Sequence, residues 1–256
     1  MIPKIIHYCW FGSKSPSRVV RKCIATWKKH LPDYKFMLWN ETNSPMEHPY
    51  VKSAYAAKKY AFVADYVRFW ALYNYGGIYL DTDMYVIKSF DDLLDNEFFC
   101  AWETATEFTQ SPSVNNCENP TTHRGGAGCS PTVSCGALGA CALGACAKKV
   151  LEKYDTLVFE NNAIEQLIIP KVITPIINDS VGVTIYPFDF FYPFPYEQRE
   201  QKNFLSYATK NTYAIHLWDL SWRSNYSKIL SGFYKKTKKI IPFWLKRSYW
   251  SKNINR

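Results

Sequence analysis

The stretch from Tyr50 to Asp83 constrains the fold more than any other part of the chain. Closely spaced alanines and bulky apolar side chains over residues 50–75 predict one long, mostly buried helix. Gly76-Gly77 predicts the C-terminal cap of that helix, and Ile78-Tyr79-Leu80 predicts a short buried strand after it. The strand leads directly into Asp81-Thr82-Asp83. A helix followed by a strand that ends in two carboxylates is typical of an α/β fold with a site at the end of the strand.

Further apolar runs extend this pattern along the chain. Strand, helix and strand are expected over residues 2–10, 17–30 and 34–39, and this order indicates a parallel sheet. More strands are expected over 98–102, 181–186 and 213–218, and a helix over 148–158. Residues 104–131 are expected to form a loop near the site, and the proline-rich and aromatic residues 188–196 a rigid loop beside a cleft. Residues 137–146 repeat Ala-Leu-Gly-Ala-Cys twice, which we interpret as close backbone packing by small side chains.

Composition and charge exclude several classes of protein. The 256 residues are 47% hydrophobic and 17% aromatic, which excludes a disordered chain. There is no run of 18 apolar residues and no signal-peptide pattern, so we expect a cytosolic protein. The net charge of +9 is concentrated after Asp219, where ten Lys or Arg residues and no Asp or Glu occur. The remainder is close to neutral, which argues against nucleic acid binding in the main cleft.

Eight cysteines form no Cys-x-x-Cys pair, and the last four, at 129, 135, 141 and 146, match no standard zinc spacing. In a cytosolic chain we expect them to be reduced thiols. A metal or redox cluster is the alternative.

Asp81 and Asp83 are the first candidate ligands. On an extended backbone, residues i and i+2 point the same way, so both carboxylates could reach one divalent cation. Such an ion would hold a phosphate-bearing ligand. The alternative is a solvated turn, because an Asp-x-Asp pattern is common by chance.

Asp65 and Arg68 are the second candidate pair. They lie at i and i+3 of the predicted helix, in a segment that is otherwise aromatic and rich in alanine. A charged pair in such surroundings needs a partner or a ligand. A nucleotide-sugar supplies ribose hydroxyls for the carboxylate and phosphate oxygens for the guanidinium. A surface ion pair is the alternative.

Three segments, in order, resemble a known family. They are Ile2-Pro3-Lys4-Ile5-Ile6-His7-Tyr8-Cys9-Trp10-Phe11-Gly12, Lys59 to Phe69 (KYAFVADYVRF), and Tyr75-Gly76-Gly77-Ile78-Tyr79-Leu80-Asp81-Thr82-Asp83. The family is that of the DXD sugar-binding glycosyltransferases, which includes bacterial capsule and lipopolysaccharide sugar transferases and yeast initiating mannosyltransferases. The glucosylating clostridial toxins are similar at the same three places. The resemblance is clear over about residues 1–103.

The resemblance implies a GT-A fold, which is a Rossmann-like nucleotide-sugar-binding α/β fold with helices on both faces of a mixed sheet. We expect this domain over residues 1–225 and a basic, aromatic C-terminal segment over 226–256. By the same resemblance, Trp10 would stack on the nucleotide base, and Asp65 and Arg68 would contact the donor. Asp81 would face the ribose and sugar hydroxyls, and Asp83 would ligate Mn²⁺ or Mg²⁺. The alternative for Trp10 is plain core packing.

The segment from His216 to Trp222 (HLWDLSW) resembles the closing segment of that family. His216 is the candidate ligand, because neutral imidazole suits Mn²⁺, although an ordinary buried histidine is the alternative. Ser221 and Trp222 could donate hydrogen bonds to the leaving phosphate. The resemblance implies retention of configuration. Glu103, Asn162 and Asp189 are candidate nucleophiles by location only, and a front-face route would need none of them.

The sequence therefore predicts a retaining, metal-dependent glycosyltransferase. It would move a hexose or related sugar from a UDP- or GDP-sugar to a glycan acceptor, in bacterial capsular or surface polysaccharide synthesis. The alternatives are a nucleotidyltransferase or a non-enzymatic membrane- or glycan-binding protein. The basic, aromatic segment 226–256 predicts contact with an anionic bilayer, which would place the protein on the inner face of the plasma membrane with a lipid-linked glycan acceptor. A solvated tail is the alternative, and nucleic acid is the least favoured partner.

Overall fold

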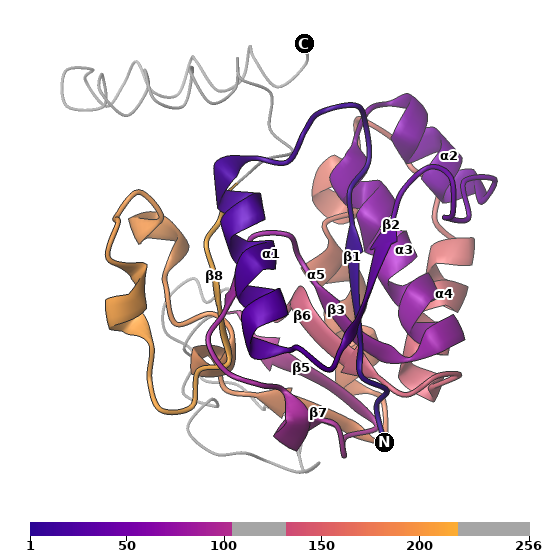
Figure 1. Cartoon of the computed structure of the whole chain (residues 1–256). Coiled ribbons are helices and arrows are strands. Elements are labelled where there is room, and N and C mark those ends of the chain that lie inside the picture. Colours follow the sequence, from indigo (N-terminus) through magenta and orange to yellow (C-terminus); the bar gives the residue numbers. More distant parts are fainter. Residues whose placement is uncertain (104–131, 220–256) are drawn as a thin grey trace, which may run out of the picture. The chain divides into compact units, whose positions relative to one another are not determined.

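The computed structural model describes residues 1–103 and 132–219 (Figure 1). The expected loop over 104–131 and the basic C-terminal segment lie outside the described residues. The boundary expected at residue 225 also lies outside them, so the division into two domains stays a prediction.

A mixed sheet forms the centre of the described fold. Its six strands have the order β2-β1-β3-β6-β5-β7 within the part that the structure describes. They are β1 (Ile5–Cys9), β2 (Lys35–Trp39), β3 (Gly77–Leu80), β5 (Phe98–Trp102), β6 (Val133–Ala140) and β7 (Val183–Tyr186). Strand β6 runs antiparallel to both of its neighbours, whereas the other pairs are parallel. The parallel pairing expected from the strand, helix and strand at the start of the chain is confirmed for β1 and β2, and the predicted mixed sheet is confirmed as well.

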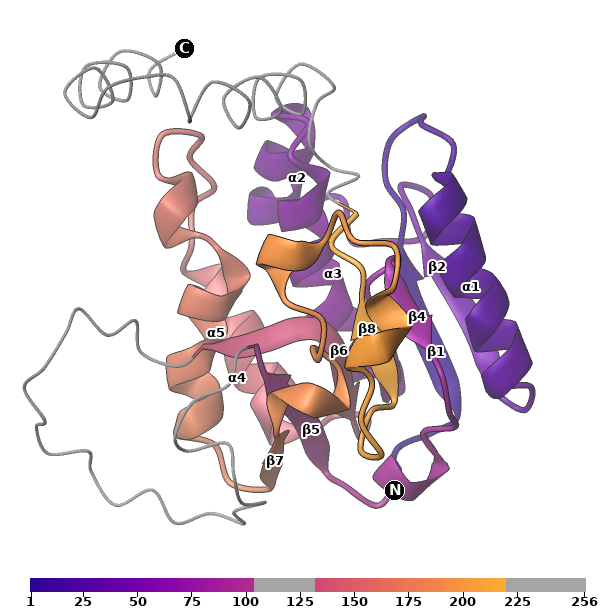
Figure 2. The same cartoon turned by 90° about the vertical axis from the view of Figure 1, so that its left-hand side faces the viewer.

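Helices cover both faces of the sheet (Figures 1 and 2). Helix α1 (Arg18–His30) packs on one face, where Trp27 and Leu31 join a core with Ile6 and Ile78. Helices α2 (Pro49–Ala56), α3 (Tyr60–Tyr75), α4 (Ala145–Asp155) and α5 (Ile169–Asn178) pack on the other. Strands β4 (Met84–Val86) and β8 (Ala214–His216) form a separate antiparallel ribbon beside α1. Short 3-10 turns lie at Asp91–Leu93, Ile164–Gln166, Phe188–Phe190, Tyr196–Gln198 and Phe204–Tyr207. The predicted α/β class is confirmed, and the arrangement fits a GT-A-like fold.

The single helix expected over 50–75 is two helices. Helix α2 ends at Ala56 and α3 begins at Tyr60. Lys58 has a left-handed backbone, with φ 57°. The Lys59 amide donates to Ala54 O and the Lys58 amide donates to Tyr55 O, which is the Schellman pattern that usually has a glycine. Because a lysine and not a glycine occupies this position, no residue type marks the break between the two helices.

Strand β6 was not expected, and it lies between β3 and β5 in the sheet. The first copy of the five-residue repeat completes β6, and the second forms the turn into α4. A side chain at Gly139 would overlap the Phe99 ring, and one at Gly136 would lie 3.1 Å from Asp81 Oδ2. The small residues therefore allow close packing, as interpreted from the sequence.

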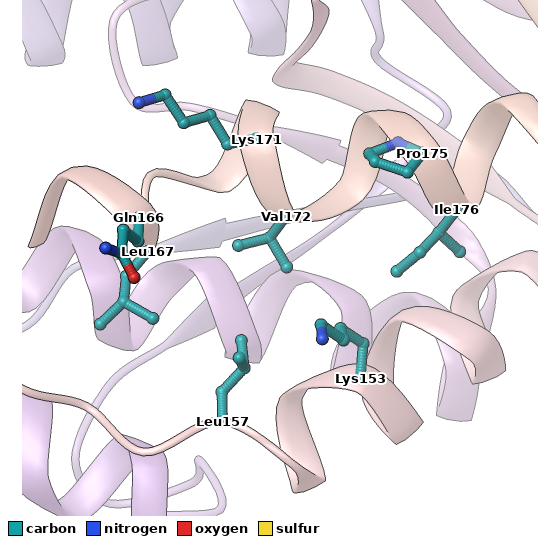
Figure 3. A pocket seen from close by; sticks show the side chains of 8 residues that line it. All are labelled: Lys153, Leu157, Gln166, Leu167, Lys171, Val172, Pro175 and Ile176. Carbon is teal, nitrogen blue, oxygen red and sulfur yellow. The ribbon is translucent and has the colours of Figure 1, made fainter. Parts of the chain in front are cut away.

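A cavity of about 540 Å³ lies between α4 and α5 (Figure 3). Three polar side chains line it: Lys153, Gln166 and Lys171. The rest of the lining is apolar and consists of Leu157, Leu167, Val172, Pro175 and Ile176. None of the candidate site residues lines it. Among the described helices, none is both long and apolar enough to cross a membrane.

Six cysteines lie within the described residues, and all are unpaired: Cys9, Cys23, Cys100, Cys135, Cys141 and Cys146. Burial raises the pKa of the Cys100 and Cys135 thiols well above the usual value. Thiols in this state are unreactive, which agrees with their interpretation as reduced core residues.

Candidate functional site

Three parallel strands deliver candidate residues to one edge of the sheet. Trp10 follows β1, Asp81 follows β3 and Glu103 follows β5. Ligands of open α/β sheets bind at the carboxyl ends of the strands, so this edge is where a site is expected.

Asp81 and Asp83 lie on a turn rather than on extended backbone. Strand β3 ends at Leu80, and the Met84 amide donates to Asp81 O at 3.0 Å. The expectation that the i and i+2 geometry of a strand aligns the two carboxylates is therefore wrong. The turn is held instead by its neighbours: Asp81 N donates to Gly136 O at 2.8 Å, and the Trp27 indole of α1 donates to Met84 O at 2.6 Å.

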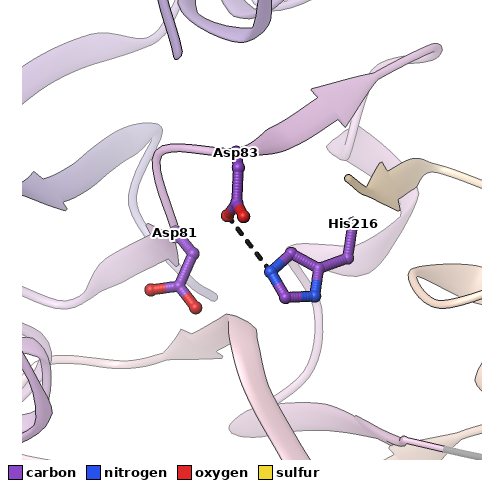
Figure 4. A group of neighbouring side chains, drawn as sticks. All are labelled: Asp81, Asp83 and His216. Atoms are coloured by element: carbon purple, nitrogen blue, oxygen red, sulfur yellow. Dashed lines mark hydrogen bonds and ion pairs between the residues drawn. The ribbon is translucent and has the colours of Figure 1, made fainter. Parts of the chain in front are cut away.

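The turn still brings both aspartates together with His216 (Figure 4). One ligand atom from each of Asp81, Asp83 and His216 lies within 4.8 Å of the others, and we call this group the acid–histidine cluster. His216 reaches it because β8 pairs with β4, which places His216 opposite Met84. His216 Nε2 lies 3.1 Å from Asp83 Oδ1.

Burial and charge act in opposite directions in this cluster. Burial alone would lower the pKa of His216, but the neighbouring carboxylates, Asp83 foremost, together raise the pKa. Burial alone would raise the pKa of Asp83, and His216 with the Asp219 amide lowers it. A divalent cation bound here would compete with a proton for His216 Nε2, because this nitrogen is the ring atom that faces Asp83.

The residues of the acid–histidine cluster fit a divalent cation. Two carboxylates and one imidazole are the oxygen and nitrogen donors that Mn²⁺ accepts, and carboxylates also suit Mg²⁺. The side chains of Asp83 and His216 are each only 14% exposed. Three protein ligands leave further positions of an ion open for phosphate oxygens.

Asp65, Arg68 and Asp81 form a connected buried group beside the cluster. Arg68 Nη2 lies 2.8 Å from Asp65 Oδ1 and 3.4 Å from Asp81 Oδ1, and Nη1 donates to Cys135 O at 2.5 Å. The guanidinium also lies over the Tyr79 ring at 4.5 Å, and the Tyr79 hydroxyl donates to Asp81 at 3.0 Å. Asp65 and Arg68 are 5% and 4% exposed, so they are not a surface ion pair. Burial raises the pKa of Asp65, although Arg68 opposes the shift.

A strained residue follows His216. Trp218 has φ 56°, an unfavourable backbone for a bulky residue that costs on the order of 1–3 kcal/mol. Around it, the Leu217 amide donates to Asp83 O at 3.1 Å and the Asp219 amide donates to Asp83 Oδ2 at 2.8 Å. Ser17, the N-cap of α1, donates to the Asp219 carboxylate at 2.9 Å. The strained turn therefore fixes the position of Asp83.

The structure places the other candidates differently. The Trp10 indole is half-buried and donates to Lys14 O at 2.6 Å. Glu103 immediately follows β5, and its carboxylate accepts a hydrogen bond from Thr132 Oγ1 at 3.3 Å. Asp189 lies in the 3-10 turn Phe188–Phe190 and accepts from Thr209 and Asn211, and Asn162 is exposed after α4.

Within residues 1–103 and 132–219, no hydrogen bond or ion pair joins Asn162 or Asp189 to the cluster. Ser221 and Trp222 lie outside the described residues.

Sequence reasoning missed Tyr79, Gly136 and the turn at Trp218 as parts of the site. Tyr79 belongs to the quoted strand motif and Trp218 to the quoted closing segment, so both were visible as neighbours of chosen residues. Gly136 carried no signal, because a single glycine in an unexpected strand has no recognisable pattern.

Two carboxylates and an imidazole lie at the carboxyl edge of the sheet of this α/β fold, beside a buried Asp–Arg pair. Such an arrangement defines a class of site in which a cation helps to bind phosphate-bearing ligands. Residues 17–100 match the family described as "Glycosyltransferase sugar-binding region containing DXD motif". This segment is therefore similar to the sugar-binding region of the DXD glycosyltransferases, and the resemblance seen in the sequence is confirmed.

Relatives found by sequence agree with this match. The chain is 35% identical over 113 residues to Inositol phosphoceramide mannosyltransferase 3 of Schizosaccharomyces pombe, which is 41% of this chain and 30% of that protein. It is 34% identical over 117 residues to "Uncharacterized glycosyltransferase L373" of Acanthamoeba polyphaga mimivirus, covering 43% and 47%. The solved structure of PaToxG Glycosyltransferase aligns with TM-score 0.49 and 17% identity over 69% of each chain. The alignments with these curated relatives span less than half of their lengths.

Proposed function

We propose that this protein is a retaining, metal-dependent glycosyltransferase that moves a hexose or related sugar from a UDP- or GDP-sugar to an acceptor hydroxyl. The observation that carries the proposal is the approach of Asp81, Asp83 and His216 to within 4.8 Å, directly beside the buried Asp65–Arg68 pair. The match of residues 17–100 to the sugar-binding region supports it independently.

The acid–histidine cluster would hold Mn²⁺ or Mg²⁺. When bound, such an ion stabilises the negative charge that develops on the departing diphosphate. Asp81 and Asp83 supply the negative charge that retains the ion, and Arg68 offsets part of it on the α3 side. Without an ion, the same carboxylates would repel the diphosphate.

Other residues would bind and orient the donor. Asp65 has a carboxylate suited to a sugar or ribose hydroxyl, and Arg68 holds it in place at 2.8 Å. Trp10, half-buried at the end of β1, offers a ring for the base. Ser221 and Trp222 are proposed to donate to the leaving phosphate.

Retention requires either a nucleophile or attack from the side of the leaving group. Of the three candidates, Glu103 is the one that immediately follows a strand whose carboxyl end lies at the same edge of the sheet as Asp81. We therefore favour Glu103 over Asn162 and Asp189 for any role at the sugar carbon, with the front-face route as the alternative.

The acceptor is proposed to be a glycan or a lipid-linked glycan. Yeast relatives are named as mannosyltransferases acting on inositol phosphoceramide, which supports a membrane lipid as the carrier. A role in bacterial capsular or surface polysaccharide synthesis is the corresponding proposal for a bacterial setting. The ten cations after Asp219 support a location at the inner face of a membrane.

A thermal-shift screen with and without Mn²⁺ tests the proposal. UDP-, GDP- and CMP-sugars are compared with nucleoside triphosphates, and one nucleotide-sugar should stabilise the protein only when metal is present. Stabilisation by triphosphates alone would favour a nucleotidyltransferase, and indifference to all ligands would favour a non-enzymatic protein.

Asp83→Asn is the matched variant, because it keeps the shape of the side chain and removes its charge. We expect the metal-dependent shift to vanish and sugar transfer to fall by about 10²-fold or more. Asp95→Asn, at an exposed carboxylate after the 3-10 turn at Asp91–Leu93, should leave both unchanged.

A further inference from the structure

The two aspartates of the turn face different neighbours. Asp81 contacts Arg68 and Tyr79 on the α3 side, whereas Asp83 contacts His216 and the Asp219 amide on the β8 side. With the donor sugar on the Asp65–Arg68 side, as proposed above, the second reactant must approach from the β8 side.

A row of rings leads away from the acid–histidine cluster on that side. The Trp218 ring lies 4.0 Å from the His216 ring, centroid to centroid, at an angle of 57°. The Tyr196 ring lies 5.5 Å from the Trp218 ring at 86°. Tyr196 belongs to the 3-10 turn Tyr196–Gln198, so residues far apart in the sequence meet here.

Polar contacts fix both outer rings without burying them. The Trp218 indole donates to Phe194 O at 2.8 Å. The Arg199 guanidinium lies 4.0 Å from the centre of the Tyr196 ring, and its Nη1 donates to Tyr196 O at 2.8 Å. Trp218 and Tyr196 nevertheless remain half-buried, in contrast to Tyr192 behind them, which is 2% exposed.

The backbone strain of Trp218 connects this row to the aspartates. With this positive φ, the amides of Leu217 and Asp219, on either side of Trp218, donate to Asp83. The Trp218 ring then lies beside His216. Strain of this kind persists where the surrounding structure holds the residue in place, and it gathers at functional sites.

We propose that Tyr196 and Trp218 form an aromatic platform that takes the sugar ring of the acceptor. One face of a pyranose carries mainly C–H groups, and these pack on the negative face of an aromatic ring while the hydroxyls stay hydrated. Arg199 acts as a positioning residue that holds the Tyr196 ring. This inference rests on the proposed function, because it assigns the acceptor side of the same site.

Saturation-transfer NMR tests the platform on the full chain with the diamagnetic ion Mg²⁺ and the nucleoside diphosphate present. The probes are methyl α-glucopyranoside, methyl α-mannopyranoside and methyl α-galactopyranoside. At least one probe should bind with saturation strongest at the C–H groups of one ring face. Tyr196→Leu should weaken that binding at least tenfold, and Tyr196→Phe should stay within about twofold because it keeps the ring.

Two further variants complete the test. Arg199→Ala should weaken binding by a smaller factor, about threefold, because the ring remains but is less restrained. Tyr75→Leu removes a 42% exposed ring at the C-terminal end of α3 and should leave sugar binding unchanged. The metal-dependent thermal shift with nucleotide should be the same in Tyr196→Leu as in the unchanged protein, which shows that the variant is folded.

Three results would overturn the platform: no sugar binding, sugar binding that is unchanged in Tyr196→Leu, or loss in that variant of saturation at the nucleobase. The thermal shift and the sugar binding can also disagree. If nucleotide gives no metal-dependent shift but sugar binding still depends on Tyr196, the proposed function is wrong and the platform stands. The two failures are therefore distinguishable.

Discussion

His7 shows how much one buried polar side chain determines in this protein. Its Nε2 lies 2.7 Å from Gly76 O, and the Trp39 indole donates to its Nδ1 at 3.1 Å. These contacts require a neutral ring with the proton on Nε2. The bond to Gly76 ties β1 to the residue that joins α3 to β3, and so positions the strand that leads to Asp81.

A second proton on His7 would face the Trp39 N–H. The folded chain should therefore bind that proton only at a pH well below the usual range of histidine. Burial lowers the pKa of His7 from 6.5 to about 4. Above pH 6.5 both the folded and the unfolded chain hold neutral His7. Between about pH 6.5 and pH 4 only the unfolded chain binds the proton, so the free energy of unfolding falls as pH falls, by on the order of 3 kcal/mol in total.

Urea unfolding at several pH values checks this effect against His7→Gln, which cannot titrate. The variant should lose less stability than the unchanged protein between pH 6.5 and pH 4.5. Imidazole nitrogen NMR gives a direct reading, and titration of His7 near pH 6.5 in the folded protein would contradict the prediction.

At the scale of elements, β6 makes the site possible. It supplies Gly136, whose carbonyl accepts from the Asp81 amide, and Cys135, whose carbonyl accepts from Arg68. It is also the strand that reverses direction between β3 and β5. Small side chains let it lie this close to larger neighbours on both sides.

Gly139→Ala tests this packing. The new methyl group would overlap the buried Phe99 ring, so we expect a loss of about 1–3 kcal/mol in the free energy of unfolding. Denaturant unfolding should show a lower midpoint with an unchanged slope. In the double variant with Phe99→Leu, the smaller side chain should recover part of the loss, and simple additivity of the two changes would argue against the overlap.

The same element shows what sequence reasoning could and could not predict. Strands with bulky apolar residues, such as β1, β3 and β5, were predicted within a few residues of their bounds. Strand β6 was not predicted, because Gly and Ala have low strand propensity. Their role here is to let neighbouring side chains pack close to the backbone, which residue type alone does not reveal. The break at Lys58 was missed for a related reason, since its left-handed backbone has no glycine to mark it.

The candidate site divides in the same way. Asp65, Arg68, Asp81 and Asp83 were chosen from their types and spacing, and His216 from the resemblance of its segment to the family. The structure brings all five together. The contacts made by backbone atoms, such as the Asp219 amide on Asp83, leave no trace in residue type. They depend on the path of the chain in space, which a pattern along the sequence does not contain.

At the scale of the whole molecule, charge is divided between two parts of the chain. Of the 31 Lys and Arg residues, ten follow Asp219, where no Asp or Glu occurs. The described fold holds the cluster of carboxylates, and the basic residues follow it in sequence. A protein that acts on a lipid-linked acceptor would use such a segment to stay near an anionic membrane, since each cation close to the surface contributes about 1 kcal/mol.

Vesicle cosedimentation tests this division of roles. Replacing Lys235, Lys236, Lys238 and Lys239 with Gln should weaken binding to phosphatidylserine vesicles by at least tenfold, because the attraction is the sum of individual cations. Replacing four exposed lysines of the described fold, Lys28, Lys29, Lys149 and Lys202, is the matched control and should have little effect. Binding should also fall as salt rises from 0.1 M to about 0.5 M, because screening shortens the range of the attraction. If the two sets of variants bind the vesicles equally well, the C-terminal residues have no special role in membrane binding.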